Sequence, residues 1–465
     1  MNRHAFAQKH KLLSTSILPA SSLVTGAAPA LPVVRPAAGQ RRFESQAVEA
    51  AITEFRQQVK DPELGWLFNN CFPNTLDTNV TYGQRAGRPD TFVGTGDGDA
   101  MSLGDSTAQV WPYLQLVKQD APLRQLVAGV INRQTQCILR DPYANSFYQD
   151  LTRVGEGLPG VHERKWAVDS LCYPIRLGYH YWKTTGDEQP FDADWRRAIA
   201  LTVSTLREQQ RKTGPGPYHY QRPALSAADT QPLGGYGYPA RPVGLLASAF
   251  RPSREAARLP FVVAANFFAV ITLRQAFLML ADIAHDNPAA QECLALSDEI
   301  AVALRQHAVV THPEFGPVYA YEVDGYGSHS LLDDASVPCL LALPYLGAAP
   351  LNEPTYQNTR RLALSPTNPF SYKGSAGEGI GSPRTGPDMI WPLSVAVRGL
   401  TSTDDAEIRA CVRQLRAAHA GTGYLPESFH KNDPATCTNA RFAKANALFG
   451  EFLWKVYQER PVLLN

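Results

Sequence analysis

The sequence predicts an all-α protein, and more narrowly an (α/α)6 toroid, in which six helical hairpins form an inner and an outer ring of helices. Long segments carry apolar residues three and four positions apart, which is the spacing of one helix face. Roughly twelve such segments follow one another, while segments typical of strands are few and short. About half of the helical segments are apolar almost all round and half are amphipathic, as expected where outer helices cover inner ones.

The helical segments are expected, in chain order, at residues 45–59, 105–117, 122–139, 163–182, 193–211, 261–284, 289–306, 330–343, 354–364, 387–400, 404–419 and 437–458. Residues 261–284 (FVVAANFFAVITLRQAFLMLADIA) are apolar almost all round, which is typical of a buried helix. No Gly/Ser-rich or Pro-rich linker interrupts residues 45–460, so a single domain is expected over residues 43–465. In a toroid the loops that lead into inner helices form the mouth of the ring, and acids in those loops are candidates for function.

The first 42 residues differ from the rest of the chain. Basic residues, including Arg3 and Lys9, precede the stretch LLSTSILPASSLVTGAA, and an Ala- and Pro-rich segment follows before regular patterning begins at Phe43. This pattern predicts an export signal and a disordered linker over residues 1–42, and therefore a periplasmic or secreted protein. A disordered tail is the alternative. The apolar stretch is too short and too rich in Ser for a membrane span.

The composition is that of an ordinary globular protein, with 44% hydrophobic and 19% charged residues and a net charge of +1. No basic surface for nucleic acid or an anionic membrane is expected from this balance. The seven cysteines are odd in number and lack CxxC spacing, and several lie in apolar runs. We therefore expect buried thiols, with neither a disulfide framework nor a metal site.

One acid stands out in the stretch GTGYLPESFHKNDP at residues 421–434, where Glu427 lies between a proline and a serine. Pro followed by Glu is typical of a helix start, because proline fits the first turn and glutamate favours the positive end of the helix dipole. The other interpretation is a catalytic carboxylate on a loop at the mouth of the ring. The other loops of the chain decide between the two.

Seven blocks follow one another in these loops: DTFVGTGDGDAMSLGDSTAQVWPYL (90–114), INRQTQCILRDPYANSF (131–147), HERKWAVDSLCYPIRL (162–177), GLLASAFRPSREA (244–256), FGPVYAYEVDGYGSHSLLDDASVPCLLALPYLG (315–347), GEGIGSPRTGPDMIWPLS (377–394) and GTGYLPESFHKNDP (421–434). In order and spacing they resemble glycoside hydrolase family 125, over about residues 43–458. The resemblance implies an inverting exo-α-mannosidase that acts on α-1,6-linked mannosides and has an (α/α)6 toroid. It further implies α-mannoside glycans as the partner, no cofactor, no metal, no nucleic acid and a monomer.

Inverting hydrolysis needs two carboxyl groups about 6.5–9.5 Å apart, one to protonate the leaving oxygen and one to activate water on the opposite face. By resemblance, Glu427 takes the place of the general base. His430 then orients that carboxylate or contacts the sugar; a loop histidine that caps a neighbour is the alternative. The general acid is altered, since the family's FRPSDD block reads Phe250-Arg-Pro-Ser-Arg-Glu255 here. Glu255 is the remaining candidate acid, but Arg254 is expected to lower its pKa and keep it ionised. If the acid belongs at position 254, none remains.

The resemblance also suggests residues that bind the substrate, namely Asp97, Asp105, Arg164, Asp169, Arg251, Ser253, Asp334 and His430. A helix N-cap is the alternative role for Asp105, and a helix N-terminus is the alternative for the Asp333–Asp334 pair. The stretch from Gly94 to Asp99 lacks the residues of a phosphate loop and the spacing of a calcium loop.

Several other positions depart from the family pattern, namely Gly104, Ala167, Arg384, Pro426 and the block 440–444. Because these departures gather at expected pocket positions, two functions stay open. One is an exported α-mannosidase with an impaired site. The other is a non-catalytic mannoside-binding or structural descendant of the fold, and a shared fold does not decide between the two.

Overall fold

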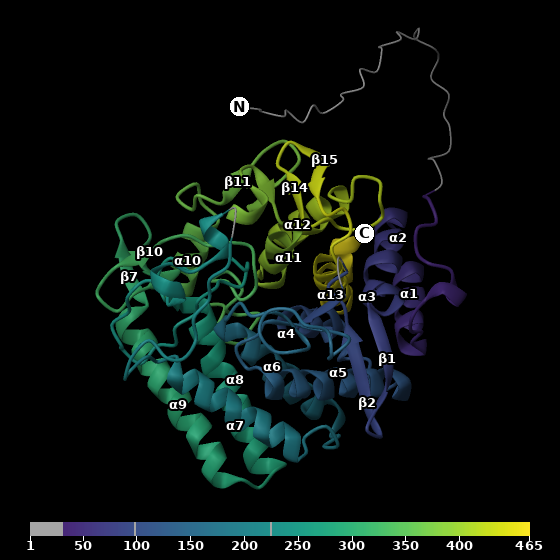
Figure 1. The fold of residues 1–465 in the computed structure, drawn as a ribbon. Coiled ribbons are helices and arrows are strands. Elements are labelled where there is room, and N and C mark those ends of the chain that lie inside the picture. Colours follow the sequence, from purple (N-terminus) through teal and green to yellow (C-terminus); the bar gives the residue numbers. More distant parts are fainter. Residues whose placement is uncertain (1–30, 97–98, 224–225) are drawn as a thin grey trace, which may run out of the picture. The chain divides into compact units, whose positions relative to one another are not determined.

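The computed structural model describes residues 31–96, 99–223 and 226–465, and its compact unit runs from Val34 to Asn465. Helices dominate this unit, and the described strands are short and form six small antiparallel sheets (Figure 1). Most of the predicted export signal lies outside the described residues, and so does Asp97.

The helices have the bounds α1 Gln46–Gln58, α2 Pro62–Cys71, α3 Asn74–Thr78, α4 Leu103–Val110, α5 Ala121–Arg140, α6 Val168–Thr185, α7 Ala193–Glu208, α8 Val263–Asp282, α9 Asn287–His307, α10 Pro354–Ala363, α11 Pro392–Leu400, α12 Asp405–Ala417 and α13 Ala443–Glu459. Several pack as sequence neighbours or near neighbours: α8 lies against α9 and α6, α5 against α7, and α11 against α12 and α13 (Figure 1). The mainly helical prediction is confirmed.

The strands have the bounds β1 Val80–Arg85, β2 Arg88–Val93, β3 Ala100–Ser102, β4 Ser146–Tyr148, β5 Val161–Glu163, β6 Phe261–Val262, β7 Val309–His312, β8 Gly316–Tyr319, β9 Glu322–Val323, β10 His329–Ser330, β11 Ser371–Lys373, β12 Glu378–Ile380, β13 Met389–Ile390, β14 Ser428–His430 and β15 Asp433–Thr438. Some of them lead directly into helices. β3 runs into α4, β6 runs into α8, and β13 ends one residue before α11. Pairing these strands with others fixes the loops that precede the helices.

Helix α8 is the apolar segment expected to be buried. By length and composition alone it is apolar enough to cross a membrane, but 72% of that stretch is buried within the protein, as in the core helix of a globular protein. Its Asn266 side chain accepts a hydrogen bond from the Leu246 backbone N–H and donates to the Leu246 carbonyl. This exchange ties the helix to the loop that leads toward Phe250 and the altered FRPSDD block.

One predicted helix is wrong. Ser330 ends strand β10, and residues 331–343 form irregular chain, bends and turns, in which the Asp333 carboxylate accepts hydrogen bonds from the backbone N–H groups of Leu340 and Leu341. Pro338 adds a residue without an N–H group, which a helix interior does not tolerate. The alternative role of Asp333 and Asp334 as a helix N-terminus is therefore also wrong. Conversely, α2 is absent from the predicted segments, although Asp61 caps it and Pro62 stands at its first position.

The ordered unit begins ahead of residue 43. Arg35 is buried and donates hydrogen bonds to Asp77 (Nε–Oδ2 2.8 Å) and to Glu49 (Nη1–Oε2 3.0 Å). Residues 38–40 form a short 3₁₀ helix. Arg35 thereby ties this segment to α1 and α3. Six of the cysteines are buried, as expected, whereas Cys437 is half-buried.

Candidate active site

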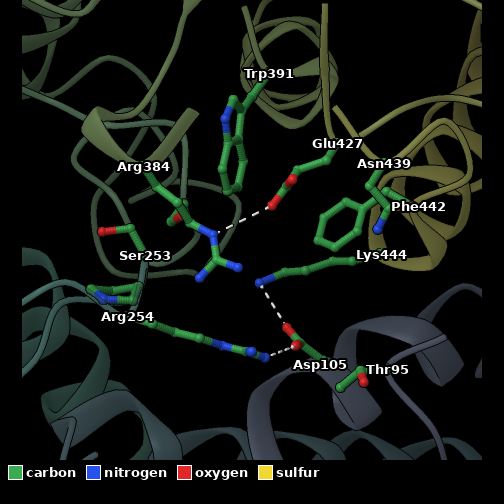
Figure 2. A pocket seen from close by; sticks show the side chains of 12 residues that line it. Thr95, Asp105, Ser253, Arg254, Arg384, Trp391, Glu427, Asn439, Phe442 and Lys444 are labelled. Carbon is green, nitrogen blue, oxygen red and sulfur yellow. Dashed lines mark hydrogen bonds and ion pairs between the residues drawn. The ribbon is translucent and has the colours of Figure 1, made fainter. Parts of the chain in front are cut away.

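A cavity of about 140 Å³ lies among loops from distant parts of the chain. Its described lining consists of Thr95, Asp105, Pro252, Ser253, Arg254, Ser336, Arg384, Trp391, Glu427, Asn439, Phe442 and Lys444 (Figure 2). Three residues of the predicted site, Glu427, Asp105 and Ser253, therefore face one cavity. Polar and charged side chains predominate, and Trp391 and Phe442 provide aromatic walls in a T-shaped pair.

Glu427 is fixed by the sheet formed by β13, β14 and β15. Its backbone N–H donates to the carbonyls of Thr438 and Asn439, at the open end of the β14–β15 pair. The Thr438 hydroxyl donates to the carboxylate at Oε2 (3.2 Å), and Arg384 Nε lies 3.6 Å from Oε1. Strand β14 starts directly after Glu427, so the helix-start interpretation is wrong. The residue holds a carboxylate, only 14% exposed, at the cavity wall.

A second charged group faces Glu427 across the cavity. Asp105, in the first turn of α4, accepts a hydrogen bond from Arg254 Nη2 (2.6 Å) and forms an ion pair with Lys444 Nζ (3.3 Å) (Figure 2). Burial acts to raise the pKa of Asp105, but Lys444 and Arg254 outweigh it and hold the pKa below its usual range. Ser102 caps α4, so Asp105 is not the N-cap residue.

Arg254 does not affect Glu255 as the sequence suggested. The backbone of Arg254 is left-handed (φ 70°), and its side chain extends away from Glu255 to reach Asp105. Burial, and then repulsion by Asp334, raise the pKa of Glu255 to about 7. The expectation that Arg254 keeps Glu255 ionised is therefore wrong, because the side chains of these two adjacent residues point in different directions.

Glu255 lies behind the cavity wall. Its carboxylate accepts a hydrogen bond from Ser253 Oγ (3.2 Å), and Ser253 lines the Glu427 cavity. Glu255 itself lines a neighbouring cavity of about 440 Å³, together with Arg251 and Arg258. The two predicted catalytic carboxyls are therefore placed close to one wall but in different cavities.

A further, smaller cavity adjoins the first and shares Asp105, Arg254 and Lys444 with it. Asp169, at the start of α6, lines it, and burial raises the pKa of Asp169 to about 7. Gly104 also lines it, and a Cβ at this position would lie 3.1 Å from the ring of Tyr173. Tyr173 thus occupies the space beside Gly104 where an arginine was expected by resemblance.

Three further residues predicted to bind the substrate, Arg251, Arg164 and His430, form contacts within the protein in this structure. Arg251 is buried in a two-point ion pair with Glu322 (2.6 and 2.8 Å) and borders both neighbouring cavities. Arg164 donates to Asp141 (2.6 Å). His430 Nδ1 accepts the Asn432 backbone N–H, which is the capping alternative.

Asp334 is fully buried, and its Oδ1 accepts the Ser336 backbone N–H. Burial raises the pKa of Asp334, against the attraction of Arg251. Its charge therefore acts on the site from within the wall, by raising the pKa of Glu255.

Several lining residues have no site role in the sequence prediction, among them Arg384, Trp391, Phe442 and Lys444. Arg384 and the block 440–444 stood out as departures from the family pattern, and that signal already pointed to the pocket. Trp391 lies inside one of the seven blocks, but the sequence does not show that the side chain of this tryptophan points into the cavity. Its indole donates to Thr385 Oγ1 (2.9 Å).

Comparisons with known proteins agree on one family. The profile of the family described as metal-independent α-mannosidase (GH125) matches residues 61–454. The Meiotically up-regulated gene 157 protein of Schizosaccharomyces pombe is 38% identical over 460 residues, which covers 94% of this chain and 90% of that protein. A Streptococcus pneumoniae structure described as a metal-independent α-mannosidase, in a non-productive complex with α-1,6-mannobiose, superposes with a TM-score of 0.86. It shares 37% identity and covers 90% of this chain and 100% of that chain.

A bacterial glucoamylase complexed with acarbose shares the fold only, with a TM-score of 0.56 and 13% identity over 86% of this chain and 56% of that chain. The profile and the two closely similar proteins cover nearly the whole compact unit. This chain belongs to glycoside hydrolase family 125, the metal-independent α-mannosidases.

Proposed function

We propose that this chain is an inverting exo-α-mannosidase that acts on α-1,6-linked mannosides, with Glu427 as the general base. The observation that carries the proposal is the placement of Glu427, whose carboxylate is held by Thr438 at the wall of a polar cavity with aromatic sides. The α-1,6-mannobiose bound in the similar Streptococcus pneumoniae structure supports the choice of linkage. The sequential packing of α5 to α9 and of α11 to α13 supports the (α/α)6 arrangement.

In the proposed reaction Glu427 takes a proton from water, and that water attacks the anomeric carbon from the side opposite the leaving group. The product is then β-mannose. Glu255 is the candidate acid, since a pKa of about 7 leaves a large protonated fraction at neutral pH. Its hydrogen bond with Ser253 connects it to the wall of the Glu427 cavity.

A mannoside-binding protein without turnover is the second candidate. It is favoured by the ion pairs of Asp105 with Arg254 and Lys444, which place charged side chains inside the proposed sugar site. We also propose that the protein is exported and monomeric, because its N-terminal sequence is typical of an export signal and the family resemblance implies a monomer.

Turnover of α-1,6-mannobiose, followed by proton NMR from the first seconds, tests the proposal. β-Mannose is expected to appear first, and Glu427→Gln is expected to lower the rate about 10²–10⁴-fold because it removes the base. Glu314→Gln, on an exposed turn, is the matched control and should not change the rate. Release of α-mannose first would disprove inversion. Binding of mannobiose without turnover would favour the binding protein.

A further inference from the structure

Three cationic side chains point into the Glu427 cavity, namely Arg254, Arg384 and Lys444 (Figure 2). Two carboxylates, Asp105 and Glu427, face them. Among the described lining residues the cavity therefore carries one more positive than negative charge. A pocket for a neutral sugar alone does not need this surplus, whereas an anionic ligand does.

Arg384 is the cation best placed to accept a ligand. Its Nε lies 3.6 Å from Glu427 Oε1, which is longer than a hydrogen bond, and its side chain is 45% exposed. A guanidinium has five N–H donors in a planar fork that matches the oxygens of a phosphate group. Arg254 and Lys444 already meet at Asp105 on the other side of the cavity. A phosphate between these groups would contact cations from both sides.

The cavity also lacks an evident proton donor opposite Glu427 among its described lining residues. Asp105 stands there, and its two cationic partners keep it ionised. Glu255 lines the neighbouring cavity. A sugar hydroxyl is a poor leaving group and depends on protonation by a factor of roughly 10²–10⁴. A phosphate monoester has a second pKa of about 6 and leaves at neutral pH as a dianion that needs no proton.

We infer that this chain hydrolyses α-mannosyl phosphodiesters, in which mannose is joined through its anomeric oxygen to a phosphate. The inference rests on the proposed role of Glu427 and on a mannosyl substrate. The Glu427 carboxylate activates water on one face of the sugar. Arg254, Lys444 and Arg384 stabilise the phosphate on the other side. The recognised chemistry is the anionic phosphate next to the anomeric carbon.

The step balances without any further reactant besides water. The water oxygen forms a bond to C1 of mannose, and one water proton goes to the Glu427 carboxylate. The bond from C1 to the bridging oxygen breaks, and its electron pair stays on that oxygen. The phosphodiester monoanion thereby yields β-mannose and a phosphate monoester dianion. The added negative charge falls where the arginines and the lysine are, which is the condition for electrostatic catalysis.

The test uses the full chain with methyl α-mannosyl phosphate in ¹⁸O-labelled water, and α-1,6-mannobiose in a parallel reaction. β-Mannose and methyl phosphate are expected from the diester, with the label in mannose because the C1–O bond breaks. Label in methyl phosphate would mean cleavage at phosphorus and would overturn the inference. Cleavage of mannobiose but not of the diester would also overturn it, while leaving the proposed function intact. Cleavage of the diester alone supports the inference and rejects the α-1,6 linkage.

Substitution of single arginines tests whether their side chains bind the phosphate of the diester. Arg254→Gln and Arg384→Gln are each expected to slow diester hydrolysis about 10–100-fold, since each removes a charged hydrogen bond to the phosphate. The exposed Arg361→Gln on α10 is the matched control and should keep the full rate. Thermal melting checks that each variant is folded, and the two arginine variants are independent of one another. Full diester turnover in both folded arginine variants would overturn the inference.

Inorganic phosphate distinguishes a general anion site from a mannosyl phosphate site. In calorimetry with the Glu427→Gln variant, which hydrolyses the diester slowly, methyl α-mannosyl phosphate is expected to bind at least about tenfold more tightly than phosphate, because the sugar adds contacts beyond the charge. Equal affinity for both would show that the cations bind free phosphate and would overturn the inference.

Discussion

The carboxyl group of Glu255 is buried beside Asp334 and accepts a hydrogen bond from Ser253. Water cannot reach it freely, so its ionised form is disfavoured and its pKa rises to about 7. Glu427, in contrast, has Arg384 within ion-pair distance and a hydroxyl donor at Thr438. Two carboxyls with such different surroundings suit the opposite roles of acid and base.

This contrast leads to a prediction on pH. A general acid works only while protonated, so turnover of α-1,6-mannobiose is expected to fall as the pH rises through about 7, the pKa of Glu255. Glu255→Gln should abolish this alkaline decline and slow the hydrolysis of mannobiose about 10²–10⁴-fold. The rate of hydrolysis of activated aryl mannosides should change little. The measurement is kcat against pH for both substrates. An unchanged profile in the variant would remove Glu255 from the mechanism.

The sequence led to part of this site. Glu427 and the altered acid block were identified from ordered motifs, and the departures at Arg384 and at residues 440–444 fell on the cavity that the structure shows. The direction of side chains was not predictable. Arg254 and Glu255 are neighbours in sequence, but a left-handed backbone at Arg254 separates their side chains. Charge partners 149 residues apart, such as Arg254 and Asp105, leave no local pattern.

At the scale of elements, β2 and α5 are packed unusually close. A Cβ on Gly129 of α5 would lie 2.3 Å from Thr91 Oγ1 and 3.0 Å from the Thr91 backbone nitrogen. The Thr91 hydroxyl also donates to the Leu126 carbonyl of α5 (2.8 Å). Only glycine lets the helix come this near to the strand. The strand in turn leads to Thr95 at the cavity wall.

We therefore expect Gly129→Ala to lower the free energy of unfolding by about 1–3 kcal/mol, because the new methyl group overlaps atoms of β2. The gain in helix propensity, about 1 kcal/mol, offsets part of the strain. Gly83→Ala on β1 is the matched control, since nothing lies within 4 Å of the place that its new methyl group would take, and it should change stability by less than about 0.5 kcal/mol. Urea denaturation of both variants provides the comparison. Equal stability would mean that the helix shifts without cost.

Most of the helices could be predicted from periodicity because their apolar faces are long and continuous. The helix predicted at residues 330–343 does not form, because this apolar run is buried in a turn structure. Hydrogen bonds to the Asp333 carboxylate hold that structure, and helical hydrogen bonds do not. The short strands also escaped prediction. Two or three residues in a strand are too few to show an alternating pattern.

On the scale of the whole molecule, the site is assembled from segments that the sequence separates widely, from Thr95 to Lys444. Periodicity alone gives helices but not the way in which their loops meet. The ordered blocks supplied that information through the family resemblance, and the family profile over residues 61–454 confirms the family. The family resemblance does not give the boundaries of the compact unit. These depend on side-chain contacts, as the first residues of the unit show.

The N-terminal boundary depends on Arg35. Its side chain is 6% exposed and pairs with Asp77, whose side chain is 1% exposed. Removing the arginine leaves a buried carboxylate without this partner, which costs about 3–5 kcal/mol for a buried pair. Arg42, in contrast, is exposed and contacts Thr81 through one long hydrogen bond. Arg35→Gln should therefore lower the free energy of unfolding, measured by urea denaturation, by several times more than Arg42→Gln.

If the protein is exported, its signal must be removed without losing this anchor. The sequence predicts a mature N-terminus between residues 26 and 45. The Arg35 ion pairs narrow this interval to residues 26–35, because a cut beyond Arg35 would leave the buried Asp77 with only its longer contact to Arg41 (3.8 Å). Mass spectrometry of the protein from its native host is expected to show a first residue in this interval. An intact Met1 would reject export, and a first residue after Arg35 would reject the anchor. Arg42→Gln, which keeps the anchor, should be processed at the same position as the natural protein.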